Sequence, residues 1–303
     1  MLLAACERRH VAEGHSLVAT GAAIKNDSVP SGVVADPCRM VLMAMGGESP
    51  LDKGIAVAQQ RVRSETNSYA ALETLGWLFV SKARTDFDPG FHKLAEQCAL
   101  CMEAHQLHGA EALLLHGYVL ENLHQFKEAE RLAIELTIKR GRSFDYGLLG
   151  DVLMEQGRLN GAIAAYQKMA DLRPDLQAYT RAAHIRWLKG DLEGAIEMMQ
   201  MAIQSASQKD AESAAWVYSR MALYQFQAGA SQKALDYCGA AMVLQSNYPP
   251  ALLLRGRVLL AEGKAIEAVG PLSRAARLTP PPRSRPLTRT PAAADRPARI
   301  PKP

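Results

Sequence analysis

Apolar residues follow no sustained period at the start of the chain. Over residues 1–48 the small and turn-forming residues are scattered, most densely over 28–36, and Gly46 and Gly47 follow a short apolar patch. A segment of this kind buries too little apolar surface to offset the entropy lost on ordering. The pattern predicts a poorly ordered leader over residues 1–48.

A helix is predicted directly after the leader. Ser49 can cap the first turn, Pro50 fits the first helical position, and the charge of Asp52 suits the positive end of the helix dipole. The next apolar side chains lie at helical spacing on one face, at Ile55, Ala58 and Val62. We therefore predict a leading helix over residues 50–64.

The apolar pattern then becomes a tandem repeat. Its clearest copy is Tyr146-x2-Leu149-Gly150-x2-Leu153, then Gly157, Ala162-x3-Tyr166 and Pro174. Small residues let two helices cross closely, and the closing proline stops the second helix. The second-helix alanine recurs at intervals of 34, 33, 33, 39 and 34 residues. These alanines are Ala95, Ala129, Ala162, Ala195, Ala234 and Ala268.

In this pattern residues 69–280 resemble tetratricopeptide repeats (TPRs), and the run 151–203 is similar to the arrays of uncharacterised bacterial TPR proteins. The resemblance implies an all-α fold, an α/α superhelical solenoid of about six tandem helix pairs within a domain over residues 49–280. It also implies a binding role, in which the first helix of each pair lines a concave groove.

Two insertions depart from the regular repeat length. About seven extra residues fall around 84–90, where turn formers predict a loop, and about five more fall near 205–213. Insertions in repeat proteins map to loops on one face, which is sometimes the binding face.

Large and polar residues of the predicted first helices are the candidate partner contacts. Aromatic and methionine side chains anchor partners well because they bury a large area at low entropic cost. The alternative is that they only fill space between adjacent first helices. The predicted groove residues are Trp77, Tyr118, Asp151, Met154, His184, Trp187, Trp216, Phe226 and Arg257, which include all three tryptophans of the chain.

The class of partner follows from what the groove contains. A clamp for acidic C-termini needs paired Asn and Lys or Arg on successive first helices, and only Asn122 lies near such a position. A mixed aromatic and polar groove suits an extended or helical peptide better. The sequence holds no G-x-S-x-G, P-loop, H-E-x-x-H or G-x-G-x-x-G motif. We therefore predict a non-catalytic scaffold for a protein or peptide partner, without a cofactor.

The C-terminal segment differs sharply in composition. Residues 281–303 contain seven of the sixteen prolines, six basic residues and one acid, so they predict a disordered Pro/Arg-rich tail. They contribute +5 to the formal net charge of +4, which leaves the other 280 residues at −1. The basic pI therefore belongs to the tail, and no nucleic-acid partner is expected for the folded part.

The five cysteines are scattered and odd in number, which argues against a disulfide framework. Only the spacing Cys98-x2-Cys101 invites a metal or redox interpretation, with His92, His105 and His108 nearby. Zinc would need a second pair of ligands from elsewhere, so two small core cysteines and no metal are the favoured interpretation. A metal- or redox-responsive protein using Cys98 and Cys101 stays open as an alternative.

The N-terminus leaves the compartment open. No run of about 18 apolar residues predicts a transmembrane segment. Leu3-Ala4-Ala5-Cys6 looks like the cleavage and lipidation site of bacterial lipoproteins, but only five residues precede the cysteine. As written, the chain would be cytoplasmic. If translation starts upstream, Cys6 could carry a lipid anchor, and the alternative function is a cell-envelope TPR lipoprotein with a structural or assembly role.

Overall fold

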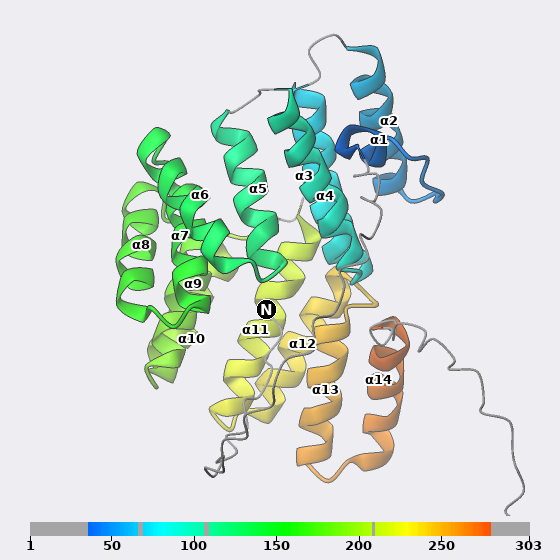
Figure 1. Ribbon diagram of the computed structural model, residues 1–303. Coiled ribbons are helices and arrows are strands. Elements are labelled where there is room, and N and C mark those ends of the chain that lie inside the picture. Colours follow the sequence, from blue (N-terminus) through cyan, green and yellow to red (C-terminus); the bar gives the residue numbers. More distant parts are fainter. Residues whose placement is uncertain (1–35, 66–68, 106–108, 208–209, 280–303) are drawn as a thin grey trace, which may run out of the picture. The chain divides into compact units, whose positions relative to one another are not determined.

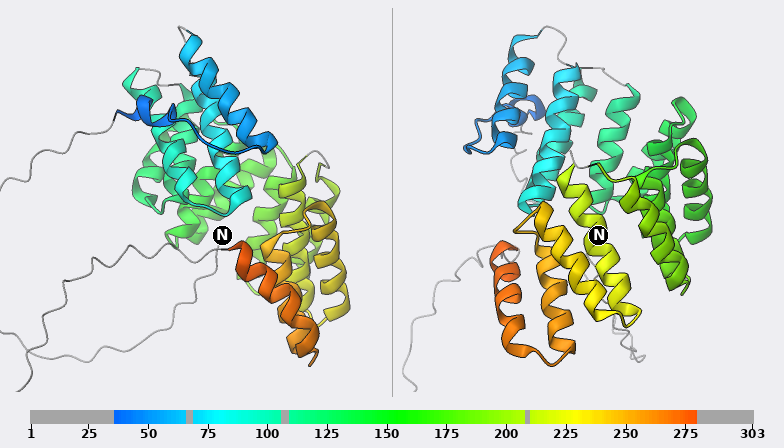
Figure 2. Two further views of the ribbon diagram at one scale, coloured as in Figure 1. Left: turned by 90° about the vertical axis from the view of Figure 1, so that its right-hand side faces the viewer. Right: turned by 180° about the vertical axis from the view of Figure 1, so that it is seen from behind.

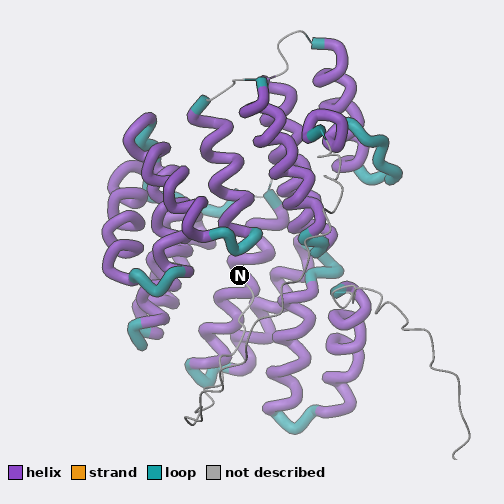
Figure 3. The backbone as a smooth tube through the Cα atoms, in the orientation of Figure 1, coloured by secondary structure: helices purple, strands orange, loops and turns teal. Residues whose placement is uncertain are grey.

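A computed structural model describes residues 36–65, 69–105, 109–207 and 210–279. These residues form fourteen helices and no strand, which confirms the all-α prediction (Figures 1 and 3). None of these helices combines the length and the apolar character needed to cross a membrane. The helices are α1 (Pro37–Val41), α2 (Pro50–Ser64), α3 (Tyr69–Asp86), α4 (Gly90–Ala104), α5 (Ala110–Asn122), α6 (Phe126–Lys139), α7 (Ser143–Glu155), α8 (Leu159–Leu172), α9 (Leu176–Leu188), α10 (Leu192–Gln204), α11 (Ala211–Gln227), α12 (Ser231–Leu244), α13 (Pro249–Ala261) and α14 (Ala265–Leu278).

Helices α3 to α14 form six antiparallel pairs, as the repeat pattern predicts (Figure 2). Small residues set the distance between the two helices of a pair. A Cβ added to Gly150 of α7 would lie 2.3 Å from the ring of Tyr166 in α8, and one added to Gly256 of α13 would lie 2.4 Å from Leu272 in α14. The repeat glycines are therefore required by close packing between helices.

The turns within four pairs contain a glycine in the left-handed backbone region. Its φ is 74° at Gly157, 82° at Gly190, 78° at Gly229 and 75° at Gly263, and a residue with a Cβ is strained there. The second pair has His124 at this position, with a φ of 60°. The same two backbone hydrogen bonds close the turn at His124 and at Gly157, so the two turns are equivalent.

His124→Gly should therefore stabilise the protein. We expect the free energy of unfolding to rise by about 0.5 kcal/mol, because the relief of left-handed strain exceeds the extra entropy of glycine in the unfolded chain. Denaturant titration measures the change. The reciprocal substitution Gly157→His should lower the stability, and a gain there would contradict the equivalence of the turns.

The leading helix α2 spans the predicted residues. Ser49 and Asp52 form a reciprocal capping box: the Ser49 hydroxyl accepts from the Asp52 amide at 3.1 Å, and the Asp52 carboxylate accepts from the Ser49 amide at 3.1 Å. The carboxylate of Asp52 also pairs with the Lys82 ammonium at 2.7 Å, which joins α2 to α3. The hydrogen bonds from Lys82 and Ser49 lower the pKa of Asp52 to about 2.

Residues 36–48, assigned to the leader by their sequence, are ordered as α1 and a following segment. Val41 is fully buried, and the side-chain amide of Gln59 donates to the carbonyl oxygens of Val41 and Met43 at 2.8 and 2.9 Å. Arg63 donates to the carbonyl oxygen of Leu42 at 2.6 Å. The sequence pattern missed α1 because five residues are too few to show a helical period. Residues 1–35 and the predicted tail lie outside the described residues.

The two insertions meet each other in the fold. The first one lengthens α3 to Asp86 and leaves only a short turn before α4, so the loop predicted over 84–90 is mostly helix. Arg84 of α3 forms an ion pair with Glu212 at the start of α11. Glu212 belongs to the second insertion. The ring of Phe87 lies 6.2 Å from that of Tyr248, just before α13. These contacts join the first pair to the fifth and sixth pairs.

Candidate partner-binding surface and cysteine site

One repeat position on the first helices lies directly after the small residue at which the two helices of a pair cross. In the first four pairs the residues at this position are Trp77, Tyr118, Asp151 and His184, and they form a row along the array. The ring centroids of Trp77 and Tyr118 lie 5.4 Å apart. Burial raises the pKa of Tyr118, and the nearby Asp151 carboxylate adds to the rise. Asp151 also lies within electrostatic reach of His184. The row is therefore continuous from α3 to α9.

An aromatic group lies at the α3 end of this row. Phe144 of α7 stacks on Tyr118 at 6.3 Å and meets Trp77 edge-on at 6.5 Å. All three side chains are only partly buried. The sequence interpretation omitted Phe144, although it lies six residues before the small residue Gly150, as Trp216 lies six residues before Ala222. That shared position in the repeat was the available signal.

Asp151 connects three helices at the middle of the row. Its carboxylate accepts from the Tyr166 hydroxyl of α8 at 2.7 Å and from the Arg181 guanidinium of α9 at 2.8 and 2.5 Å. The side chains of Asp151 and Arg181 are 22% and 15% exposed. Met154, one turn after Asp151, has its sulfur 3.8 Å from the Tyr166 hydroxyl. Because both carboxylate oxygens have partners, Asp151 serves packing between repeats as well as the surface.

A second aromatic group joins α9 to α11. His184 stacks on Trp187 with ring centroids 5.5 Å apart, and Trp187 stacks on Tyr224 at 6.2 Å. The indole nitrogen of Trp187 donates to the side-chain oxygen of Gln227 at 2.7 Å. Burial, together with the charge of Arg220, lowers the pKa of His184 to about 4, so its imidazole is neutral at pH 7.

Arg220 places a positive charge beside this second group. Its guanidinium lies 5.4 Å from the centroid of the Trp216 ring, within range of a cation–π interaction. Among the ion pairs formed by the described residues, Arg220 has no carboxylate partner. It was not among the predicted groove residues.

Acidic side chains gather on α5 and α7. Burial raises the pKa of Glu121 to about 8, and the neighbouring carboxylates of Asp151 and Glu155 add to the rise. The Asn122 amide donates to Glu121 at 2.8 Å. The Glu121 carboxyl is therefore mostly protonated at pH 7, whereas α11 presents an arginine without an ion-pair partner among the described residues.

The last two predicted groove residues do not join these groups. Phe226 packs into the core between α11 and α13, beside Leu254 and Val258. Arg257 of α13 is exposed, and nothing in the described residues holds it in place. We infer that the surface of interest runs from α3 to α11.

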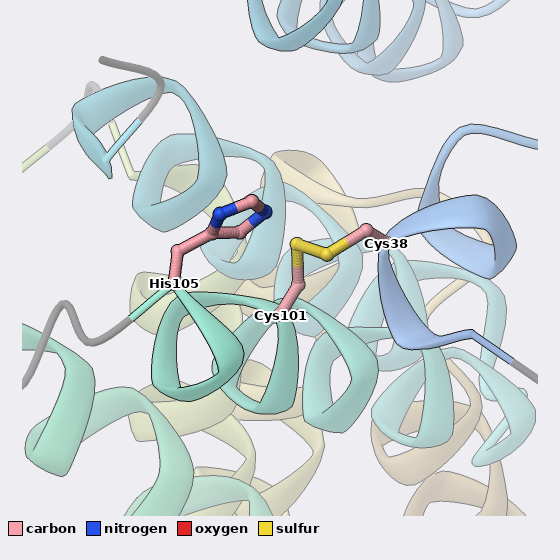
Figure 4. A group of neighbouring side chains, drawn as sticks. All are labelled: Cys38, Cys101 and His105. Atoms are coloured by element: carbon pink, nitrogen blue, oxygen red, sulfur yellow. A yellow bond between two sulfur atoms is a disulfide. The ribbon is translucent and has the colours of Figure 1, made fainter.

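The cysteines pair differently from the sequence interpretation. Cys38 of α1 and Cys101 of α4 form a disulfide, with their Cα atoms 5.0 Å apart and 63 residues apart in sequence (Figure 4). Cys98 is a free thiol, fully buried, and burial raises its pKa, so it stays protonated. Both cysteines of α4 lie in the core, as the favoured interpretation expects. Cys101, however, is bonded to Cys38 and does not pair with Cys98.

Of the two nearby histidines that the structure describes, His105 lies at the disulfide and His92 does not. The His105 ring is exposed, and its ligand atoms lie within 4.8 Å of the sulfurs of Cys38 and Cys101. His92 is buried, and the Nδ1 atom of its ring has no hydrogen-bond partner among the described residues. His108 lies outside the described residues.

Comparisons with known proteins agree with the repeat architecture. Residues 146–176 match the family model described as tetratricopeptide repeat. A thermophilic TPR protein of Thermus thermophilus is 15% identical with a TM-score of 0.54, and the match covers 63% of this chain and 99% of that one. A tetratricopeptide repeat protein of Parabacteroides merdae is 15% identical with a TM-score of 0.52, covering 75% and 88%.

A larger assembly shares the fold too. The APC/C hetero-tetramer Cut9–Hcn1 is 14% identical with a TM-score of 0.57, and the match covers 76% of this chain and 46% of that one. No curated protein sequence matches this chain. Likeness at these identities shows the fold alone.

Six stacked helix pairs with matching turns define a helical-repeat protein. Residues 146–176 match the tetratricopeptide repeat model, and the six helix pairs have the same architecture as the tetratricopeptide-repeat structures above. Tetratricopeptide-repeat proteins generally mediate protein–protein interactions, and their scaffold is generally non-catalytic.

Proposed function

We propose that this protein is a non-catalytic scaffold that binds a peptide or protein partner along the first helices α3, α5, α7, α9 and α11. The observation that carries the proposal is the row Trp77, Tyr118, Asp151 and His184, which is flanked by two aromatic groups. Partly buried aromatic side chains are already ordered, so a partner can bury them at little entropic cost.

Charge supports a partner of mixed character. Arg220 on α11 is a positive charge beside Trp216, whereas Glu121 on α5 has a pKa of about 8 and is mostly neutral at pH 7. A segment with a carboxylate near Arg220 and an apolar side chain between the aromatic groups would complement both features. An extended or helical peptide satisfies this requirement.

The disulfide favours a second candidate function, which is a structural or assembly role in the cell envelope. Disulfides form and persist mainly in oxidising compartments, and Cys38 and Cys101 are paired here. The intact mass of the protein from its native host tests this candidate, because lipidation at Cys6 would add a large apolar mass. An unmodified N-terminus on a cytoplasmic protein would exclude it.

The leading proposal is tested by alanine substitutions on the first helices of the full chain. Trp77→Ala, Trp187→Ala and Trp216→Ala together should weaken a partner captured from host lysate by about thirtyfold, the effect of losing about 2 kcal/mol of binding energy. The affinity is measured by titrating the purified partner.

Matched controls lie on the second helices. Ile138 of α6 and Val243 of α12 are 82% and 86% exposed, so Ile138→Ala and Val243→Ala should leave binding unchanged. Circular dichroism confirms that every variant is folded. If the second-helix variants lose binding and the tryptophan variant does not, the site lies elsewhere on the array.

A further inference from the structure

We propose that Cys38, Cys101 and His105 form a binding site for a single Zn²⁺ ion when the disulfide is reduced. Their ligand atoms already lie within 4.8 Å of one another. Two thiolates and an imidazole are preferred zinc ligands, and three protein ligands with one open position form a known kind of zinc site. This site is separate from partner binding on the first helices.

Two of the three ligands come from adjacent turns of one helix. Cys101 lies in the last turn of α4, and His105 is its C-cap, whose backbone amide donates to the Cys101 carbonyl oxygen at 3.2 Å. Residues four apart on a helix present their side chains on the same face. Figure 4 shows both side chains on the side of α4 that faces Cys38.

The third ligand is kept in place by contacts that do not depend on the sulfur–sulfur bond. Val41 of α1 is fully buried, and Gln59 of α2 donates to the carbonyl oxygens of Val41 and Met43. Arg63 holds the carbonyl oxygen of Leu42. Val41 also lies in the core that α4 lines, so helix α1 stays against α4 after reduction. The two thiols then need to separate only to about 3.8 Å, the spacing of two thiolates on tetrahedral zinc.

Charge and exposure also suit a zinc ion. Two thiolates cancel the double charge of Zn²⁺ and the neutral imidazole adds none, so the complex is neutral and can lie half-buried. Cys101 is 1% exposed and His105 is exposed, so the open coordination position faces solvent.

The chemistry balances in two steps. A phosphine reduces the disulfide with one water molecule, giving two thiols and a phosphine oxide. Zn²⁺ then binds the two sulfurs and one imidazole nitrogen, and the two thiol protons are released to solvent. A dithiol reductant can replace the phosphine in the first step and becomes a disulfide itself.

The test is a zinc titration of the full chain, with Cys6→Ser in every sample to remove a competing thiol. Phosphine reduction without oxygen should raise the number of titratable thiols by two. The reduced protein should then take one equivalent of Zn²⁺ from a chromophoric chelator, and the oxidised protein none. Co²⁺ in place of Zn²⁺ should give thiolate-to-metal charge-transfer absorption.

The variants decide which residues bind the metal. Cys38→Ser and His105→Ala should each weaken zinc binding at least about tenfold, because each removes one of three ligands. Cys98→Ser and His124→Ala are the matched controls and should bind zinc like the parent. His105 is exposed, so its variant tests the proposal even if the cysteine variant folds poorly.

Two results would overturn the proposal. One is a reduced protein that has gained two thiols and binds no zinc. The other is zinc binding that is unaffected by Cys38→Ser and His105→Ala, or abolished by Cys98→Ser, which would return the site to the Cys98-x2-Cys101 pair.

Discussion

Asp151→Ala should lower the free energy of unfolding by about 3 kcal/mol, one of the largest effects expected for a single residue on the first helices. The substitution leaves the Tyr166 hydroxyl without its acceptor and the Arg181 guanidinium without its carboxylate. Both groups are largely buried, so water replaces the lost partner poorly. Denaturant unfolding followed by circular dichroism measures the loss.

A matched control separates this network from a general effect of losing an acid. Asp171 lies near the end of α8, where the Gln167 amide is its hydrogen-bond donor at 2.8 Å. Asp171→Ala should change stability by less than about 0.5 kcal/mol. Equal losses in the two variants would contradict a special role of Asp151 between repeats.

The same experiment bears on function. If Asp151→Ala is as stable as the parent, the carboxylate does not hold α7, α8 and α9 together and is free to contact a partner directly. If the predicted loss is found, Asp151 is a positioning residue, which keeps Tyr118 and His184 in line. Any loss of partner binding by the Asp151 variant must then be compared with its loss of stability before it is assigned to a direct contact.

Local signals in the sequence predict the helices well. The capping residues Ser49 and Asp52 set the start of α2, and the left-handed glycines mark the turns within four pairs. These features depend on residues a few positions apart, so the printed sequence contains all the information they need. The row of first-helix residues was also predictable, because one position recurs in every repeat.

Contacts between distant segments were not predictable in the same way. Asp151 and Arg181 are thirty residues apart and belong to neighbouring repeats, so no local period links them. The Arg84–Glu212 pair spans 128 residues. It could have been guessed only from the idea that two insertions on one face meet each other.

The cysteines show how spacing alone can mislead. Residues three apart on a helix are neighbours, yet they point in directions that differ by about 60°. Cys98 faces α3, where its Cβ would lie 3.3 Å from a Cβ added to Gly76. Cys101 points toward α1 and Cys38. The Cys98-x2-Cys101 spacing therefore suggested a pair, whereas on the helix Cys98 contacts α3 and Cys101 contacts α1.

Breaking the disulfide should lower the free energy of unfolding of the N-terminal helices by about 4 kcal/mol. Cys38 and Cys101 are 63 residues apart. Closing a loop of that length lowers the conformational entropy of the unfolded chain, which stabilises the folded state by about this free energy. Cys38→Ser is the cleaner substitution because Cys38 is only partly buried, whereas Cys101 is in the core.

Two measurements define this effect. Denaturant titration of the parent, with and without a phosphine and with a chelator present to keep zinc away, should show the loss on reduction, whereas Cys38→Ser should be insensitive to the phosphine. Hydrogen exchange should quicken in α1 to α4 and stay unchanged in α9 and α10, because each repeat is stabilised mainly by the elements it contacts. A parent protein equally stable in both conditions would show that α1 is held by Val41, Gln59 and Arg63 alone, since their contacts survive reduction.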